Sequence, residues 1–219
     1  MMLKGIIFDF DGTLAETNTL ILKSMSKTFM DLFGSYTDAQ LMDCIGPPLA
    51  MTAQELFPEN PQLFINTYRS HQLEFHDLMV TAYPGVIEML KKLQLMRLKL
   101  AIVTSKKRDM FTKGLRKLEM ESYFSVFVTE DDVTNYKPDP EPINLALSKL
   151  GLSAGECIMV GDNFHDILAA HEVGMKSVAV GWAIKGLDVL KKYDPDYIIN
   201  EANDIFKIID EFGGKKANE

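Results

Sequence analysis

The stretch Gly5-Ile6-Ile7-Phe8-Asp9-Phe10-Asp11-Gly12-Thr13 decides how the rest of the chain is interpreted. Its first four residues form a short apolar run, which is typical of a strand buried in a parallel sheet. Because ligands of open α/β sheets bind beyond the carboxyl ends of the strands, we expect Asp9 at the mouth of the sheet and Asp11 in the following loop. Gly12, which has no Cβ, lets the backbone approach a ligand closely. A strand followed by an ordinary acidic Asp-Gly turn fits this stretch equally well.

Composition and charge narrow the classes of protein to consider. Of the 219 residues, 47% are hydrophobic and 25% are charged, which is ordinary for a soluble globular protein. The net charge of −8 argues against a nucleic-acid or acidic-membrane partner. No apolar run approaches the roughly 18 residues that cross a membrane, and no signal-like segment precedes Asp9. Cys44 and Cys157 lack disulfide or zinc spacing, so we expect buried thiols in a cytoplasmic protein. A monomer or a weak homo-oligomer is expected.

The pattern of helices and strands changes at about residue 82. Before it, helical periodicity predicts helices near residues 21–33, 38–44, 49–57 and 61–78, and no strand in the range 15–81. After it, helices at 86–95, 109–118, 141–150, 166–173, 187–192 and 204–211 alternate with strands at 98–103, 126–128, 157–160, 177–180 and 197–199. This alternation predicts a parallel sheet with right-handed crossovers. The expected fold is therefore α/β, with a Rossmann-like parallel-sheet core of residues 1–14 and 82–219 and an inserted all-helical cap of residues 15–81. Residues 213–219 are expected to fray.

Polar residues also follow two later segments of the predicted core. The strand at 98–103 is followed by Thr104, Ser105 and Lys106, whose hydroxyl and backbone N–H groups suit a phosphate oxygen or simply cap the next helix. Lys137 lies on a loop stiffened by three prolines, which would hold it as a point charge against phosphate. An exposed lysine before a helix that starts with proline is the alternative interpretation.

The strand at 157–160 is followed by Gly161, Asp162 and, four residues later, Asp166. Acids near a helix N-terminus are also a plain structural device, which applies to Asp166 more than to Asp162. Each of these signals is modest alone, but together they place acids, a hydroxyl and a lysine at one edge of a single sheet.

Taken in order, Asp-Phe-Asp-Gly-Thr, Val-Thr-Ser, Lys-Pro and Gly-Asp-x-x-x-Asp resemble the four motifs of the haloacid dehalogenase-like (HAD) phosphohydrolases. The helical segment resembles the C1 cap of that superfamily. The resemblance implies that Asp9 is the nucleophile that takes the phosphoryl group and that Asp11 is the general acid and base. It also implies that Lys137 bridges the nucleophile and the phosphate.

The same resemblance implies a Mg²⁺ cofactor. The ion would be held by Asp9, by the backbone carbonyl of Asp11 and by Asp162, with Asp166 in the shell behind them. A hard cation with oxygen ligands fits such a set. Thr104 is expected to bind the phosphoryl oxygens. The residues expected at the substrate are Thr104, Ser105, Gly12 and Lys106.

Within the superfamily, the chain resembles most the bacterial HAD-type inorganic pyrophosphatases, on residues 45–49, 76–77, 103–109, 161–168 and 181–186. The predicted substrate is therefore pyrophosphate, with Lys106, Lys107 and Arg108 beside the departing phosphate, although a solvated basic helix start explains this run equally well. A phosphoglycolate phosphatase or another small phosphomonoesterase is the alternative, and a phosphosugar mutase is less favoured. A dehalogenase would not need Asp11, so the presence of Asp11 argues against that activity.

The four histidines show no metal-site spacing. They are His71, His76, His165 and His171, and most are expected on the surface or at interfaces. His165 lies inside the fourth motif and could approach the site, but the acid and base roles are already filled.

Overall fold

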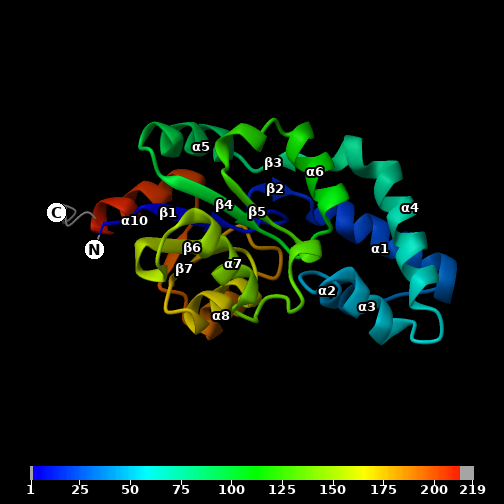
Figure 1. Cartoon of the computed structure of the whole chain (residues 1–219). Coiled ribbons are helices and arrows are strands. Elements are labelled where there is room, and N and C mark those ends of the chain that lie inside the picture. Colours follow the sequence, from blue (N-terminus) through cyan, green and yellow to red (C-terminus); the bar gives the residue numbers. More distant parts are fainter. Residues whose placement is uncertain (1, 213–219) are drawn as a thin grey trace.

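The computed structural model describes residues 2–212 and contains a six-stranded parallel sheet in the order β5-β4-β1-β6-β7-β8 (Figure 1). The strands are β1 (Gly5–Phe8), β4 (Lys99–Val103), β5 (Val126–Val128), β6 (Cys157–Gly161), β7 (Lys176–Val180) and β8 (Tyr197–Ile199). Every neighbouring pair is parallel. The predicted α/β parallel-sheet fold is confirmed.

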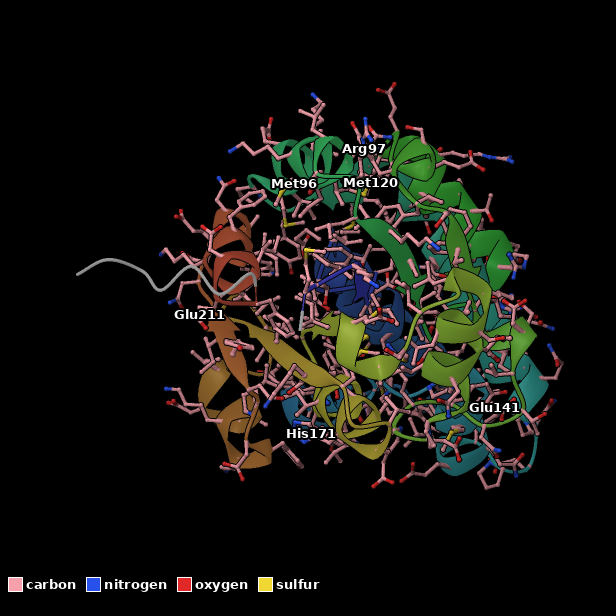
Figure 2. The ribbon with its side chains drawn as sticks, turned by 60° about the vertical axis from the view of Figure 1, so that its left-hand side comes forward. Met96, Arg97, Met120, Glu141, His171 and Glu211 are labelled. Atoms are coloured by element: carbon pink, nitrogen blue, oxygen red, sulfur yellow. The ribbon has the colours of Figure 1, made fainter. Side chains whose placement is uncertain are left out.

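Helices cover both faces of the sheet because alternate residues of each strand point to opposite sides. Ile6 and Phe8 of β1 belong to a hydrophobic cluster with helices α5 (Val86–Leu95), α6 (Arg108–Lys117) and α10 (Ile205–Phe212). Ile7 belongs to a second cluster with α7 (Glu141–Leu150) and α8 (Phe164–Glu172). Figure 2 shows the two layers, with Met96 and Arg97 just after α5 on one side and His171 of α8 on the other. A short helix, α9 (Leu187–Leu190), precedes β8.

Four further helices lie beyond the carboxyl ends of the strands (Figure 1). They are α1 (Asn18–Phe33), α2 (Asp38–Asp43), α3 (Leu49–Leu56) and α4 (Pro61–Met79), and they pack around their own hydrophobic cluster, which includes Met25, Phe29 and Phe64. Gly34 ends α1 in the left-handed conformation that favours glycine, with φ of 76°. This separate cluster supports the predicted division into a core and a helical segment of residues 15–81, which we retain as a proposal.

One feature of the helical segment corrects the prediction that residues 15–81 lack strands. Ala15–Glu16 (β2) pairs antiparallel with Thr81–Ala82 (β3), so a two-stranded ribbon joins the helical segment to the sheet at both of its ends. Strands of two residues are too short to show a period-2 pattern, which is why the sequence gives no sign of them.

Helix α8 begins two residues before its predicted start at Asp166 because Asn163 caps it. The Asn163 side chain accepts a hydrogen bond from the His165 backbone N–H at 3.3 Å, and Asp166 accepts one from the Asn163 N–H at 3.1 Å. No helix within residues 2–212 combines the length and the apolar character needed to cross a membrane. The predicted fraying of residues 213–219 concerns a segment outside the described residues.

Candidate active site

The register of the three central strands brings the predicted motif residues to one edge of the sheet. Phe8 of β1 is the partner of Ile102 in β4 and of Val160 in β6. Asp9 follows directly after β1, Thr104 directly after β4, and Asp162 directly after β6. The Thr104 backbone N–H donates to Val128 O at 2.9 Å, which extends the pairing of β4 with β5. This bond fixes the backbone that carries the Thr104 hydroxyl. Residues far apart in the sequence therefore meet in one place.

Lys137 is the electrostatic centre of this edge. Its Nζ donates to Asp9 Oδ1 at 2.8 Å, to Asp166 Oδ1 at 2.6 Å and to Val103 O at 2.9 Å. The ammonium group thereby uses all three of its donors, and only 4% of the side chain is exposed. Asp166 and Asp9 hold the pKa of Lys137 above its ordinary value although burial opposes them. Lys137 is therefore a fixed positive charge beside Asp9.

The acids around Lys137 lie close enough to share a cation. Ligand oxygens of Asp9, Asp162 and Asp166 lie within 4.8 Å of one another. Burial, which Lys137 only partly offsets, raises the pKa of Asp9 to about 7, and burial together with Asp9 and Asp166 raises the pKa of Asp162. Like charges held this close in a buried site favour either a proton or a metal ion among them.

The hydrogen bonds separate these acids into two kinds. Both oxygens of Asp166 are occupied, Oδ1 by Lys137 and Oδ2 by the Asn163 N–H. Asp162 has only one distant contact among the described residues, from Thr13 Oγ1 at 3.5 Å, so its oxygens are available to a cation. Oxygen-only ligands of this kind fit Mg²⁺. The arrangement supports the prediction that Asp9 and Asp162 hold the metal with Asp166 behind them.

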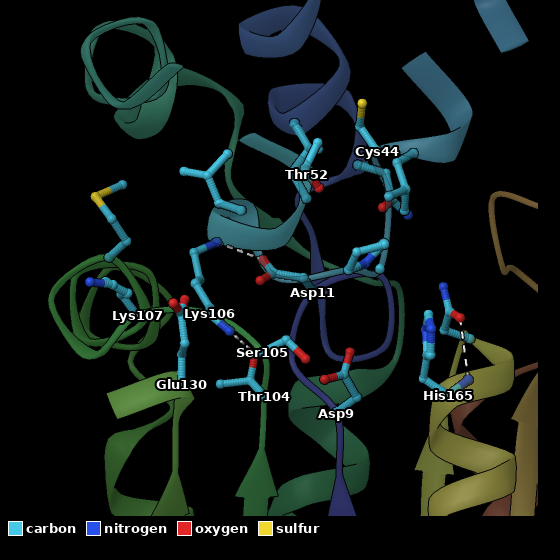
Figure 3. A pocket seen from close by; sticks show the side chains of 18 of the residues that line it. Asp9, Asp11, Cys44, Thr52, Thr104, Ser105, Lys106, Lys107, Glu130 and His165 are labelled. Atoms are coloured by element: carbon cyan, nitrogen blue, oxygen red, sulfur yellow. Dashed lines mark hydrogen bonds and ion pairs between the residues drawn. The ribbon is translucent and has the colours of Figure 1, made fainter. Parts of the chain in front are cut away.

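Gly12 keeps the loop after β1 against the acid cluster. Its φ is +80°, and a Cβ at this position would overlap the Asp162 carboxylate. Asp11, at the start of the same turn, accepts a hydrogen bond from Lys106 Nζ at 2.7 Å (Figure 3). The Lys106 backbone N–H in turn donates to Thr104 Oγ1 at 3.2 Å. The predicted acid–base residue and the predicted phosphate hydroxyl are thus connected through one lysine.

A cavity that is partly open to solvent lies between this edge and the helical segment. The core wall carries all of the residues predicted at the substrate except Gly12, which is not among the lining residues. The helical segment contributes the opposite wall, and the lining residues from α1, α3 and α4 include Asn18, Met25, Thr52, Tyr68, Arg69 and Gln72.

The basic residues of the cavity differ in part from those predicted. Lys106 and Lys107 line it, but Arg108 does not. The Arg108 guanidinium pairs with Asp132, and its backbone N–H donates to Asp131 Oδ2 at 2.8 Å, so the prediction that Arg108 lies beside the departing phosphate is wrong. These two acids follow β5 and are neighbours of Arg108 only in the folded chain. Arg69 of α4 lines the cavity instead, without any local signal in the sequence.

The cavity is also lined by Glu130, which was not anticipated at the site, and by His165, which was expected to be able to approach it. Glu130, on the loop after β5, is 8% exposed and lines the cavity. His165 also lines it, and burial lowers its pKa to about 4, which leaves the imidazole neutral.

His76 corrects the expectation of surface histidines, because it is fully buried and contacts Asp77 Oδ1 at 2.8 Å. Cys44 and Cys157 are buried free thiols, as predicted.

Comparison with known proteins agrees with this geometry. Residues 6–180 match the family model of the haloacid dehalogenase-like hydrolases. The chain is 42% identical over 210 residues to the pyrophosphatase PpaX of Halalkalibacterium halodurans, covering 95% of this chain and 98% of the relative. It is 43% identical over 205 residues to the pyrophosphatase PpaX of Bacillus pumilus, covering 93% and 95%.

Solved structures resemble it over nearly its whole length. A predicted phosphoglycolate phosphatase from Haemophilus somnus superposes with a TM-score of 0.85 at 25% identity, covering 95% of this chain and 98% of the other. A haloacid dehalogenase-like hydrolase from Streptococcus pneumoniae gives a TM-score of 0.81 at 26% identity, covering 94% and 98%. On the family model, the relatives and the fold together, the chain belongs to the haloacid dehalogenase-like hydrolases.

Proposed function

We propose that this protein is a Mg²⁺-dependent inorganic pyrophosphatase that works through a phosphoaspartate on Asp9. The observation that carries this proposal is the pairing of two charge clusters across one cavity. Asp9 with Lys137 lies at the sheet edge, and the cations Lys107 and Arg69 line the same cavity. A substrate with a phosphate at each end suits both clusters at once. The similarity to relatives named as pyrophosphatases supports the same choice.

In the first half-reaction, Asp9 attacks the phosphorus atom of the nearer phosphate. The bond from phosphorus to the bridging oxygen breaks, and the distal phosphate leaves with the electron pair. Lys137 holds Asp9 in place and neutralises charge that builds up on the transferred group. The Thr104 hydroxyl, at the end of β4, is proposed to donate to an equatorial phosphoryl oxygen.

Asp11 is proposed to move the protons. It donates one to the leaving phosphate and later accepts one from the water that attacks phosphorus and releases Asp9. In the structure, Lys106 occupies Asp11 Oδ1, which leaves Oδ2 available for proton transfer. Phosphate is a better leaving group than an alkoxide, so pyrophosphate makes a smaller demand on Asp11 than a monoester does.

Asp9, the Asp11 backbone carbonyl and Asp162 are proposed to hold Mg²⁺. When bound, the ion neutralises negative charge on the transferred phosphoryl group and on the buried acids. Asp166 and Lys137 position these ligands through the hydrogen bonds described above.

Phosphoglycolate phosphatase activity is the second candidate. A small dianionic monoester would also fit between Lys137 and the cations Lys107 and Arg69, and a structural neighbour carries that name as a prediction. The difference lies at the distal end, where phosphoglycolate presents a carboxylate and pyrophosphate presents a phosphate.

Side-by-side kinetics with pyrophosphate, phosphoglycolate and hexose phosphates in Mg²⁺ test the proposal. We expect pyrophosphate to have the highest kcat/KM. Arg69→Gln should lower kcat/KM for pyrophosphate by about 10- to 100-fold, the loss of one charged hydrogen bond. Arg108→Gln is the matched control, since Arg108 points to Asp132 and should change the value little. A clear preference for a monoester, or equal losses in the two variants, would exclude the pyrophosphatase assignment.

A further inference from the structure

Glu130 is a buried acid that the proposed mechanism leaves unused. It is 8% exposed and lines the same cavity as Asp9 and Lys137. Among residues 2–212 its carboxylate has neither a hydrogen-bond donor nor a cation within ion-pair distance, although its backbone N–H is fixed by Lys106 O at 3.2 Å. Its oxygens are not among the fully buried side-chain atoms without a partner, so they face the cavity, where a bound group can reach them.

The groups around Glu130 come from several elements of the fold. Lys107 precedes α6, and Asp109 lies in the first turn of that helix. Arg69 comes from α4 across the cavity, Asp131 is the next residue in the chain, and Tyr136 lies on the loop that leads to Lys137. Burial raises the pKa of Glu130, and Lys107 and Arg69 oppose that rise. Lys107, Arg69 and Glu130 thus line the same cavity. Figure 3 shows Lys107 and Glu130 on the side of α6.

Resting on the proposed function, we propose that Glu130 and the distal phosphate of bound pyrophosphate share one proton. Glu130 is then a specificity-determining residue that selects substrates whose far end is a protonatable phosphate. Either Glu130 is ionised and accepts a hydrogen bond from a P–OH group, or it is protonated and donates to P–O⁻. Lys107 and Arg69 balance the remaining negative charge.

The chemistry of the candidate substrates explains why such a group discriminates. Phosphate groups lose their last proton at a pKa near 6 or above, so a P–OH is available around neutral pH. A carboxylate, with an ordinary pKa of about 4, carries no proton there and would meet ionised Glu130 as a like charge. An alkyl tail offers neither a charge nor a proton. Glu130 therefore favours a distal phosphate over a distal carboxylate.

Kinetics of Glu130→Gln across pH test this inference, because the amide keeps the shape and supplies a permanent donor. The measured quantity is the ratio of kcat/KM for pyrophosphate to kcat/KM for a monoester with an uncharged alkyl tail. In the wild type this ratio should fall about tenfold per pH unit once the shared proton is lost. In Glu130→Gln this ratio should be flat over the same interval. The variant should also gain activity towards phosphoglycolate relative to pyrophosphate at pH 7, through KM rather than kcat.

Asp131→Asn is the matched control, since it removes the same charge one residue away on an exposed side chain that does not line the cavity. It should keep the wild-type fall of the ratio with pH, moved slightly to lower pH because Asp131 helps to raise the pKa of Glu130. A wild-type profile in Glu130→Gln, or the same change in both variants, would overturn the inference. The proposed function would still stand in that case, provided that the wild type hydrolyses pyrophosphate. Absence of pyrophosphate hydrolysis in the wild type would remove both.

A binding measurement on the unaltered protein avoids any effect of substitution on folding. Methylenediphosphonate keeps two phosphate-like ends and is not hydrolysed. Calorimetry in buffers with different ionisation enthalpies counts the protons taken up, at a pH where Glu130 and the free ligand are both ionised. We expect about one proton more for this ligand than for orthophosphate. Equal proton uptake for the two ligands would overturn the inference.

Discussion

Replacing Lys137 with methionine should destabilise the protein far more than its single charge suggests. The methionine keeps much of the length of the side chain but removes all three hydrogen bonds, to Asp9, Asp166 and Val103 O. Breaking a buried ion pair by removing one partner typically costs about 3–5 kcal/mol, because it leaves an uncompensated buried charge. For a chain of this length, that corresponds to a fall in Tm of about 6–20 °C.

The loss should depend on pH in a defined direction. Without Lys137, the pKa of Asp9 rises further above its value of about 7, since Lys137 is the group that lowers it. At pH 5 Asp9 is protonated with or without Lys137, so the Asp9 part of the loss disappears, whereas at pH 8 the full loss is expected. Thermal unfolding followed by far-UV circular dichroism, with metal removed by chelator, measures this difference.

Two comparisons make the result decisive. Lys4→Met breaks an ion pair with Glu156 that lies at the surface, and it should leave Tm close to the wild type. Adding Asp166→Asn to Lys137→Met removes one of the unpaired buried charges and should restore part of the stability at pH 8. If Lys137→Met has the same Tm as Lys4→Met at both pH values, the description of Lys137 as the electrostatic centre of the site is refuted.

The remaining predictions concern the loop after β1 and the metal. Gly12→Ala should raise the Mg²⁺ concentration for half activity at least about tenfold, because a Cβ would overlap the Asp162 carboxylate; Gly34→Ala, which has a similar φ but no neighbour within 4 Å, should leave that concentration unchanged. The pKa of Asp9, about 7 against an ordinary 3.8, means that the folded protein holds a proton that the unfolded chain has lost between these values. The metal-free protein should therefore lose stability as pH rises through that window, and Mg²⁺ should raise Tm more at pH 8 than at pH 5. Melting curves with and without Mg²⁺ measure both effects, and a larger gain at pH 5 would contradict the assignment of Asp9 and Asp162 to the cation.

Much of the fold could be predicted because its signals are local. Buried parallel strands such as β1 and β6 are short apolar runs, and helix α7 is bounded by Pro140 and by Gly151 in the left-handed conformation. Their predicted bounds differ from the observed ones by at most one residue. The ribbon of β2 and β3 has no such signal, since its pairing joins segments separated by the whole helical segment.

The same distinction between local signals and contacts of distant segments applies to the candidate site. Asp9, Thr104 and Asp162 could be placed together because each follows a strand of one sheet, so the topology alone fixes their neighbourhood. Arg108 could not be placed, because the acids that hold it follow a different strand. Arg69 was missed for the complementary reason: its helix is amphipathic, and only the packing of α4 over the sheet edge reveals which of its polar residues faces the cavity.

The surroundings of Glu130 could not be predicted from the sequence. In the sequence it belongs to the acidic run Glu130-Asp131-Asp132, which is typical of an exposed turn. In the structure, Asp131 is exposed and Asp132 pairs with Arg108, whereas Glu130 turns into the cavity. Three adjacent acids thus have three different surroundings, and these are set by α6 and the cavity rather than by neighbouring residues.

Chemical trapping of the phosphorylated enzyme tests the central claim most directly. The protein would be mixed with ³²P-labelled pyrophosphate and Mg²⁺, quenched in acid within milliseconds, and reduced with borohydride, which converts a phosphoaspartate to homoserine. We predict transient label on the protein and homoserine at position 9 by mass spectrometry, and neither in Asp9→Asn, whose turnover should fall by at least about a thousandfold. Rapid pyrophosphate hydrolysis with no label at Asp9, or near wild-type turnover by Asp9→Asn, would contradict the account.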